Sequence, residues 1–304
     1  MGQELVRRSG KPAAPLWSTQ VMIDMPGLVS DVHTAYADAG ATVATTNTYA
    51  IHRDRLRGGS TNHYAVEGLD MPNREDQLES LLDAAVREAD AVRDRSKIAG
   101  SIGPLGASYR ADMQPDLETA TTLYAEIAGL LAPDVDYLLF ETIPSLEAAR
   151  ACLAAGRTTD RPVWLAFTVD DEDGSKLRSG EPLQEAARIG QDADAVLANC
   201  SLPEVMPAAL DALALANRPT GAYANAFTMI TQAFLDGGTT VQGLSARDDM
   251  GPDIYANHAM TWIEHGATIL GGCCETGPAH IAAIQSRVRA GGHTLTDPML
   301  HLAT

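Results

Sequence analysis

The chain has 304 residues, of which 45% are hydrophobic and 20% charged, a composition typical of a globular protein with a full core. Its 22 Lys and Arg against 40 Asp and Glu give a formal net charge of −18 without any basic block, which argues against nucleic acid or an anionic membrane as partner. It contains no run of 18 apolar residues and no signal-peptide core, so we expect a cytoplasmic protein whose cysteines bind metal or react rather than form disulfides.

Short β-branched or apolar runs alternate along the chain with longer Ala-, Leu- and Glu-rich stretches of helical periodicity. The chain opens on a helix-like stretch, residues 3–8, with no strand before it. We expect strands over 41–48, 97–103, 135–142, 162–169, 195–200, 219–225 and 267–273. We expect helices over 27–39, 75–95, 116–131, 145–156, 181–189, 203–216, 254–265 and 277–290. This alternation predicts a parallel sheet covered by helices.

The order of these elements is typical of an α/β protein with a (β/α)8 TIM barrel. The expected strands are one short of the eight that a barrel needs, and the gap lies at the start of the chain. No linker, internal repeat or low-complexity segment separates a second domain, so we expect residues 1–304 to form a single barrel. Two long connections, 52–74 and 229–252, are expected to lie over the active-site end of the barrel.

Three of the four cysteines stand at the ends of predicted strands. Cys200 ends one, and the adjacent Cys273 and Cys274 end another after a glycine pair. Strand ends gather at one mouth of a barrel, so the three sulfurs are expected to converge there. Thiolates suit zinc, and three protein ligands with an open fourth position are typical of a catalytic zinc site. Cys152 falls within a predicted helix and is expected to pack as a small hydrophobic residue.

Other polar residues follow predicted strands and point to a substrate pocket. A fourth zinc position would bind a substrate thiol and keep it deprotonated, the form that attacks carbon. Glu141 closes an apolar strand, and its carboxylate is a candidate partner for a substrate ammonium, with a solvated strand-end charge as the alternative. The polar run 45–48, which includes Asn47, either lines the pocket or forms an ordinary turn.

Together these residues resemble the homocysteine S-methyltransferase family of zinc-dependent thiol methyltransferases, which includes betaine– and S-methylmethionine–homocysteine methyltransferases. The resemblance runs along nearly the whole chain. It rests on the motifs Ala44-Thr45-Thr46-Asn47-Thr48-Tyr49, Gly100-Ser101-Ile102-Gly103-Pro104, Phe140-Glu141-Thr142-Ile143-Pro144-Ser145, Asn199-Cys200-Ser201 and Gly271-Gly272-Cys273-Cys274-Glu275.

The resemblance implies a (β/α)8 barrel in which Cys200, Cys273 and Cys274 bind zinc. It also implies that Glu141 holds the amino-acid head of homocysteine and that Asn47 is a substrate-pocket residue. The chain departs from the family at its start. Members usually begin with a strand and an Asp-Gly-Gly turn before a Met-Gly-x-Glu-Leu motif, whereas this chain begins at that motif. We therefore expect the natural product to begin further upstream and to carry the missing first strand.

These observations predict zinc-dependent methyl transfer from a sulfonium or ammonium donor, of the S-methylmethionine or betaine type, to homocysteine. The expected partners are these small molecules, and no feature of the sequence specifies an oligomeric state. Five aromatic residues are candidates for a cage around a cationic donor, with core packing as the alternative: Tyr49, Trp164, Phe167, Tyr223 and Phe227. The rival functions are a non-catalytic zinc- or thiol-binding barrel, a redox switch at Cys273 and Cys274, and a methyltransferase for another thiol that uses a separate corrinoid protein.

Overall fold

A parallel sheet forms the centre of the molecule. The computed structural model describes residues 1–12, 14, 16–57, 72–230, 235 and 244–296. The strands in this part of the chain are β1 (Val43–Thr45), β2 (Lys97–Ile102), β3 (Tyr137–Ile143), β4 (Val163–Phe167), β5 (Ala195–Asn199), β6 (Thr220–Tyr223) and β7 (Ala267–Leu270). Each strand pairs in parallel with the next along the chain, in the order β1-β2-β3-β4-β5-β6-β7.

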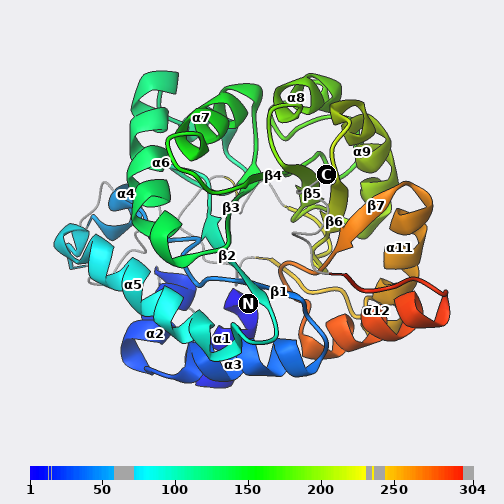
Figure 1. Ribbon diagram of the computed structural model, residues 1–304, viewed down its shortest axis with the longest axis horizontal. Coiled ribbons are helices and arrows are strands. Elements are labelled where there is room, and N and C mark those ends of the chain that lie inside the picture. The colour runs from blue at the N-terminus through cyan, green and yellow to red at the C-terminus, as the bar shows by residue number, and fades with distance from the viewer. Residues whose placement is uncertain (13, 15, 58–71, 231–234, 236–243, 297–304) are drawn as a thin grey trace.

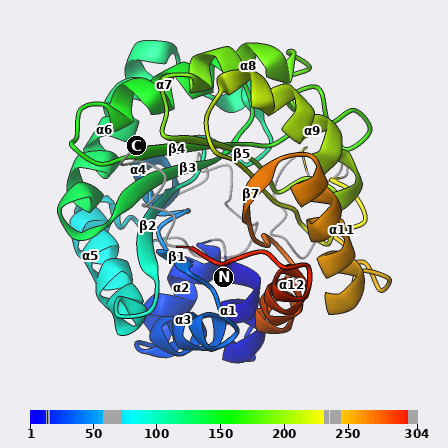
Figure 2. The ribbon, with the colours of Figure 1, turned by 45° about the vertical axis from the view of Figure 1, so that its right-hand side comes forward.

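Helices surround this sheet as an outer ring (Figures 1 and 2). The N-terminal helices are α1 (Gly2–Ser9), α2 (Trp17–Asp24) and α3 (Leu28–Asp38), followed by the short α4 (Arg53–Leu56). The others are α5 (Leu78–Ala89), α6 (Leu117–Leu131), α7 (Leu146–Gly156), α8 (Leu183–Gly190), α9 (Met206–Leu213), α11 (Pro252–Glu264) and α12 (Pro278–Ala290). Among the described residues, no helix is both long and apolar enough to cross a bilayer.

The sequence predicted all seven strands, each slightly longer than observed. Many of the extra predicted residues lie beyond the observed strand ends, where single bonds to the neighbouring strand continue, as from the Thr46 N–H to the Ala99 carbonyl and from the Cys200 N–H to the Tyr223 carbonyl. All eight predicted helices are confirmed, and the opening helix-like stretch is α1. Helices α2 and α4 were missed, and the predicted helix 75–95 is α5 with a 3₁₀ turn at either end. The predicted long connections lie partly outside the described residues, at 58–71, 231–234 and 236–243.

Alternation along the strands separates two hydrophobic layers. In β3, Tyr137 and Leu139 pack inside the barrel with Trp164 of β4, whereas Leu138 and Phe140 pack outward against the helices. The Tyr137 and Trp164 rings stack in this interior with centroids 4.2 Å apart. Successive side chains of a strand point to opposite faces, so the next inward position of β3 after Leu139 is residue 141.

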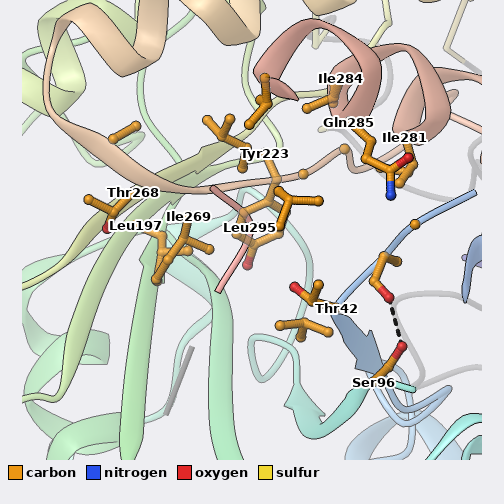
Figure 3. A pocket seen from close by; sticks show the side chains of 18 of the residues that line it. Thr42, Ser96, Leu197, Tyr223, Thr268, Ile269, Ile281, Ile284, Gln285 and Leu295 are labelled. Carbon is orange, nitrogen blue, oxygen red and sulfur yellow. Dashed lines mark hydrogen bonds between the residues drawn. The ribbon is translucent and has the colours of Figure 1, made fainter. Parts of the chain in front are cut away.

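The barrel is open between β1 and β7. Within the described part of the chain, each of these two strands pairs with a neighbour on one side only. A cavity of ≈ 660 Å³ lies at this opening, between the inner face of the sheet and helices α3 and α12. Figure 3 shows Leu197, Tyr223 and Ile269 on one side of it and Thr42 on the other. The opening lies beside β1, the position at which the sequence analysis found one strand too few for a complete barrel.

Candidate metal centre and substrate cavity

Three sulfur atoms meet at the end of the sheet where β5 and β7 finish. The Cys200 Sγ lies 3.0 Å from the Cys273 Sγ and 3.8 Å from the Cys274 Sγ. All three sulfurs are within 4.8 Å of one another. In a tetrahedral zinc site with Zn–S bonds of about 2.3 Å, neighbouring sulfurs are about 3.8 Å apart. The trio therefore fits a zinc ion with small side-chain adjustments, and its thiolate chemistry suits that metal.

The backbone at the end of β6 and just after it holds the two cysteine loops against each other. The Cys200 N–H donates to the Tyr223 carbonyl (3.1 Å), and the Cys273 N–H donates to the Ala224 carbonyl (2.9 Å). The Ala226 N–H then donates to the Cys274 carbonyl (3.0 Å). Residues 223–226 thus lie between the loops and bond to both. This arrangement explains how cysteines 73 residues apart in the sequence come to share one site.

Gly272 is required for close packing within the second cysteine loop. A Cβ at this position would lie 2.2 Å from the Thr276 Oγ1. The Thr276 hydroxyl donates to the Cys273 carbonyl at 2.8 Å and so ties the loop together. Any larger residue at position 272 would therefore clash with the side chain of Thr276.

Proximity of the three thiols shifts their pKa values in opposite directions. Hydrogen bonds from the Cys273 and Cys274 thiols lower the pKa of Cys200 well below its usual value. The same contacts with Cys200 raise the pKa of Cys273 and of Cys274. A cluster of this kind holds one negative charge easily and resists the second and third. A bound cation relieves this repulsion, as expected of a metal-binding cluster.

Glu141 occupies the inward position of β3 and is 8% exposed. The Ser101 hydroxyl donates to its Oε1, and the Tyr223 hydroxyl donates to its Oε2 at 3.2 Å. Burial raises the pKa of Glu141 to about 7, although the hydrogen bonds from Ser101 and Tyr223 oppose the shift. A buried carboxyl group held by two polar partners is suited to receive an ammonium group.

The sulfur trio, Glu141 and Asn47 line one cavity of ≈ 170 Å³. Asn47 is buried, and its side-chain amide donates to the Ser18 carbonyl at 3.1 Å. Residues of α1 and α2 also form part of the wall, although the sequence pattern had not indicated any of them. The structure thus brings the three cysteines, Glu141 and Asn47 into one cavity, whereas only some of the aromatic candidates join them.

The aromatic candidates separate into two groups. Tyr49 and Tyr223 line the cavity of the sulfur trio. Trp164 faces the cavity at the open side of the barrel instead, while Phe167 and Phe227 are packed in hydrophobic clusters. Trp17, which the sequence analysis did not consider, meets Tyr49 edge to face at 6.2 Å between centroids. The remaining aromatic wall includes Tyr109.

Asn199 and Thr142 join the ends of β3 and β5. The Asn199 Oδ1 accepts the Thr142 N–H at 2.9 Å, and its Nδ2 donates to the Thr142 Oγ1 at 3.0 Å. Thr142 and Cys200 both have left-handed backbones, with φ of 62° and 51°. Such conformations are costly for residues other than glycine and persist only when neighbours enforce them. The contact between Asn199 and Thr142 therefore fixes the relative positions of Glu141, which precedes Thr142, and Cys200, which follows Asn199.

We expect Asn199→Ala to lower the free energy of unfolding by about 2–4 kcal/mol, because it leaves the buried Thr142 N–H without an acceptor. Urea denaturation followed by circular dichroism measures this change. Asn257→Ala, at an exposed position of α11, is the matched control and should change stability by less than about 0.5 kcal/mol. Equal effects of the two substitutions would contradict the role given to Asn199.

Comparisons with known proteins agree with this site. The family model described as homocysteine S-methyltransferase matches residues 1–288. Homocysteine S-methyltransferase 4 of Zea mays is 28% identical, with 95% of this chain and 87% of that protein covered. Homocysteine S-methyltransferase of Escherichia coli is also 28% identical, with 94% and 93% covered. The crystal structure of the metallated E. coli homocysteine methyltransferase MmuM superposes with a TM-score of 0.73 at 26% identity, covering 94% of each chain.

Proposed function

Because the chain belongs to the homocysteine S-methyltransferase family, we propose that it methylates L-homocysteine to methionine with a sulfonium or ammonium donor. The observation that carries the proposal is the shared cavity. Three convergent sulfurs, a buried carboxyl group and an aromatic wall line a space of ≈ 170 Å³. An amino acid with a thiol at the end of a short chain has the groups that match these features.

Each part of the cavity has a role in the proposed reaction. Cys200, Cys273 and Cys274 would hold zinc, and the ion would lower the pKa of the acceptor thiol so that it reacts as a thiolate. The carboxylate of Glu141 would bind the substrate ammonium, with Ser101 and Tyr223 holding both of its oxygens in place. The distance between this carboxylate and the sulfur trio would then select the length of the acceptor chain.

The methyl group would pass directly between the two substrates. The acceptor sulfur forms a bond to the methyl carbon as the bond between that carbon and the donor sulfur or nitrogen breaks. The electron pair of the broken bond stays with the donor atom. A sulfonium or quaternary ammonium donor leaves as a neutral group, so no general acid is needed. The aromatic rings of Trp17, Tyr49 and Tyr223 line the cavity and suit a cationic methyl group.

Zinc-loaded protein is expected to form methionine from homocysteine with S-methylmethionine or betaine, each supplied separately. The measurement is methionine by mass spectrometry, with a deuterated donor methyl group to show that the transferred methyl group comes from the donor. Cysteine as acceptor is the control, since its side chain is one carbon shorter and should not reach from Glu141 to the sulfur trio. Zinc-loaded protein that forms no methionine with either donor would refute the proposed donor class. Transfer to cysteine as fast as to homocysteine would refute the selection of chain length.

A further inference from the structure

Tyr109 lies against the cysteine trio although it comes from a different part of the chain. It follows β2, 91 residues before Cys200, and its hydroxyl is 2.9 Å from the Cys200 Sγ. The side chain is 8% exposed and packs in one hydrophobic cluster with Cys200 and Phe227. In the thiolate form the sulfur has no proton, so the tyrosine hydroxyl must be the donor of this hydrogen bond.

Two features hold Tyr109 in this position. Its backbone is left-handed, with φ of 66°, a conformation that a bulky residue keeps only when its surroundings require it. The guanidinium group of Arg178 lies over its ring, 5.4 Å from the centroid. Arg178 is in turn fixed by Asp171 through two hydrogen bonds of 2.7 and 3.0 Å, and both side chains are mostly buried.

The same network reaches the loop that carries Cys200. The carboxylate of Asp171 accepts the Leu202 N–H at 3.1 Å, two residues beyond the cysteine. The ring of Tyr109 and the backbone after Cys200 are therefore fixed by one buried ion pair. This pair sets the distance between the hydroxyl and the sulfur more rigidly than a surface contact could.

We propose that Tyr109 is a positioning residue whose hydroxyl donates a hydrogen bond to the Cys200 thiolate and thereby strengthens zinc binding by the trio. The proposal rests on the proposed function in that it takes zinc as the metal. A hydrogen bond to a ligating atom fixes its orientation and stabilises its charged form, and loss of such a partner commonly weakens metal binding 10- to 100-fold. The bond also withdraws charge from the sulfur and so changes its electronic spectrum when a coloured metal is bound.

The test is Tyr109→Phe, which removes the hydroxyl and keeps the ring under Arg178. Competition with a chromophoric chelator should show zinc affinity lowered about tenfold or more. With Co²⁺ in place of zinc, the sulfur-to-metal charge-transfer band should move to longer wavelength, because the sulfur has lost a hydrogen bond. Tyr49→Phe is the matched control. It removes a hydroxyl from the same cavity, but that hydroxyl pairs with Ser108 and not with a sulfur.

The possible outcomes separate this proposal from the proposed function. Zinc affinity and a cobalt band that are unchanged in Tyr109→Phe would overturn the role of Tyr109 and leave the methyltransferase proposal intact. Equal weakening in Tyr109→Phe and Tyr49→Phe would also overturn it, because the cause would then be cavity packing. A wild-type protein that binds neither metal would refute both proposals, whereas failure of methyl transfer with normal metal binding would refute only the function.

Discussion

Cys273→Ala should abolish stoichiometric zinc binding and reduce methionine formation by roughly a thousandfold or more, since a lost ligand removes metal chemistry worth several kcal/mol. The substitution leaves two sulfurs, Cys200 and Cys274, at 3.8 Å. Two ligands cannot match the affinity of three, and the acceptor thiol then keeps its ordinary pKa. Zinc per chain measured by plasma emission spectroscopy, together with the methionine assay, tests both expectations.

Cys152→Ala is the matched control for this experiment. Cys152 is buried in α7, among the hydrophobic side chains of the outer layer and away from the cavity, as the sequence predicted. Its replacement should cost some stability through lost packing while zinc content and activity stay near the wild-type values. An active, zinc-free Cys273→Ala protein would contradict the metal-centred mechanism, and loss of zinc in Cys152→Ala would show that the assay reports general unfolding.

Glu141→Gln should raise the KM for homocysteine about a hundredfold while zinc content is unchanged. Truncating the charge of one partner in a buried ion pair typically costs 2–5 kcal/mol in binding, and two powers of ten correspond to the lower part of that range. The amide keeps an oxygen for the Ser101 hydroxyl and nearly the same volume, so the cavity is preserved. Steady-state kinetics with saturating donor measure the effect, and Glu147→Gln at an exposed position of α7 serves as control.

The same substitution should stabilise the metal-free protein above neutral pH. Burial raises the pKa of Glu141 from 4.5 to about 7 in the folded state, so folding favours its protonated form. Its contribution to stability is therefore lost as the pH rises from 4.5 to 7, and the penalty is constant above 7. At roughly 1.4 kcal/mol per pKa unit the full penalty is on the order of 3 kcal/mol.

Denaturation at two pH values isolates the stability penalty that arises from the raised pKa of Glu141. At pH 8 Glu141→Gln should have the larger free energy of unfolding, and at pH 5 the gain should fall below roughly 1 kcal/mol. The wild-type protein should also bind homocysteine more tightly as the pH rises through 7, because the carboxylate form is the one that pairs with an ammonium. A stability difference that does not change between pH 5 and pH 8 would contradict the raised pKa of Glu141.

The sequence was sufficient to locate the strands and the main helices, and to place the candidate site at the ends of the strands. Strand and helix periodicities differ, so all seven strands and the main helices could be located from one chain. Parallel strands end at the same edge, and the cysteines at positions 200, 273 and 274 follow two such strands. Their convergence therefore followed from the topology alone. Glu141 could be placed by the same argument, as the polar end of an apolar strand.

The tertiary structure decided which face of the sheet each strand residue occupies and which residues distant in the sequence are in contact. Strand β4 is buried on both faces, so its pattern gave no sign that Trp164 points inward and Phe167 outward. Helix α2 was missed because its amphipathic pattern is weak, yet its Trp17 lines the cavity. The contact of Tyr109 with Cys200 has no signal in the sequence, because it depends on a loop conformation enforced by a buried ion pair. Local patterns determined which residues reach the mouth of the barrel, and long-range packing determined which of them touch.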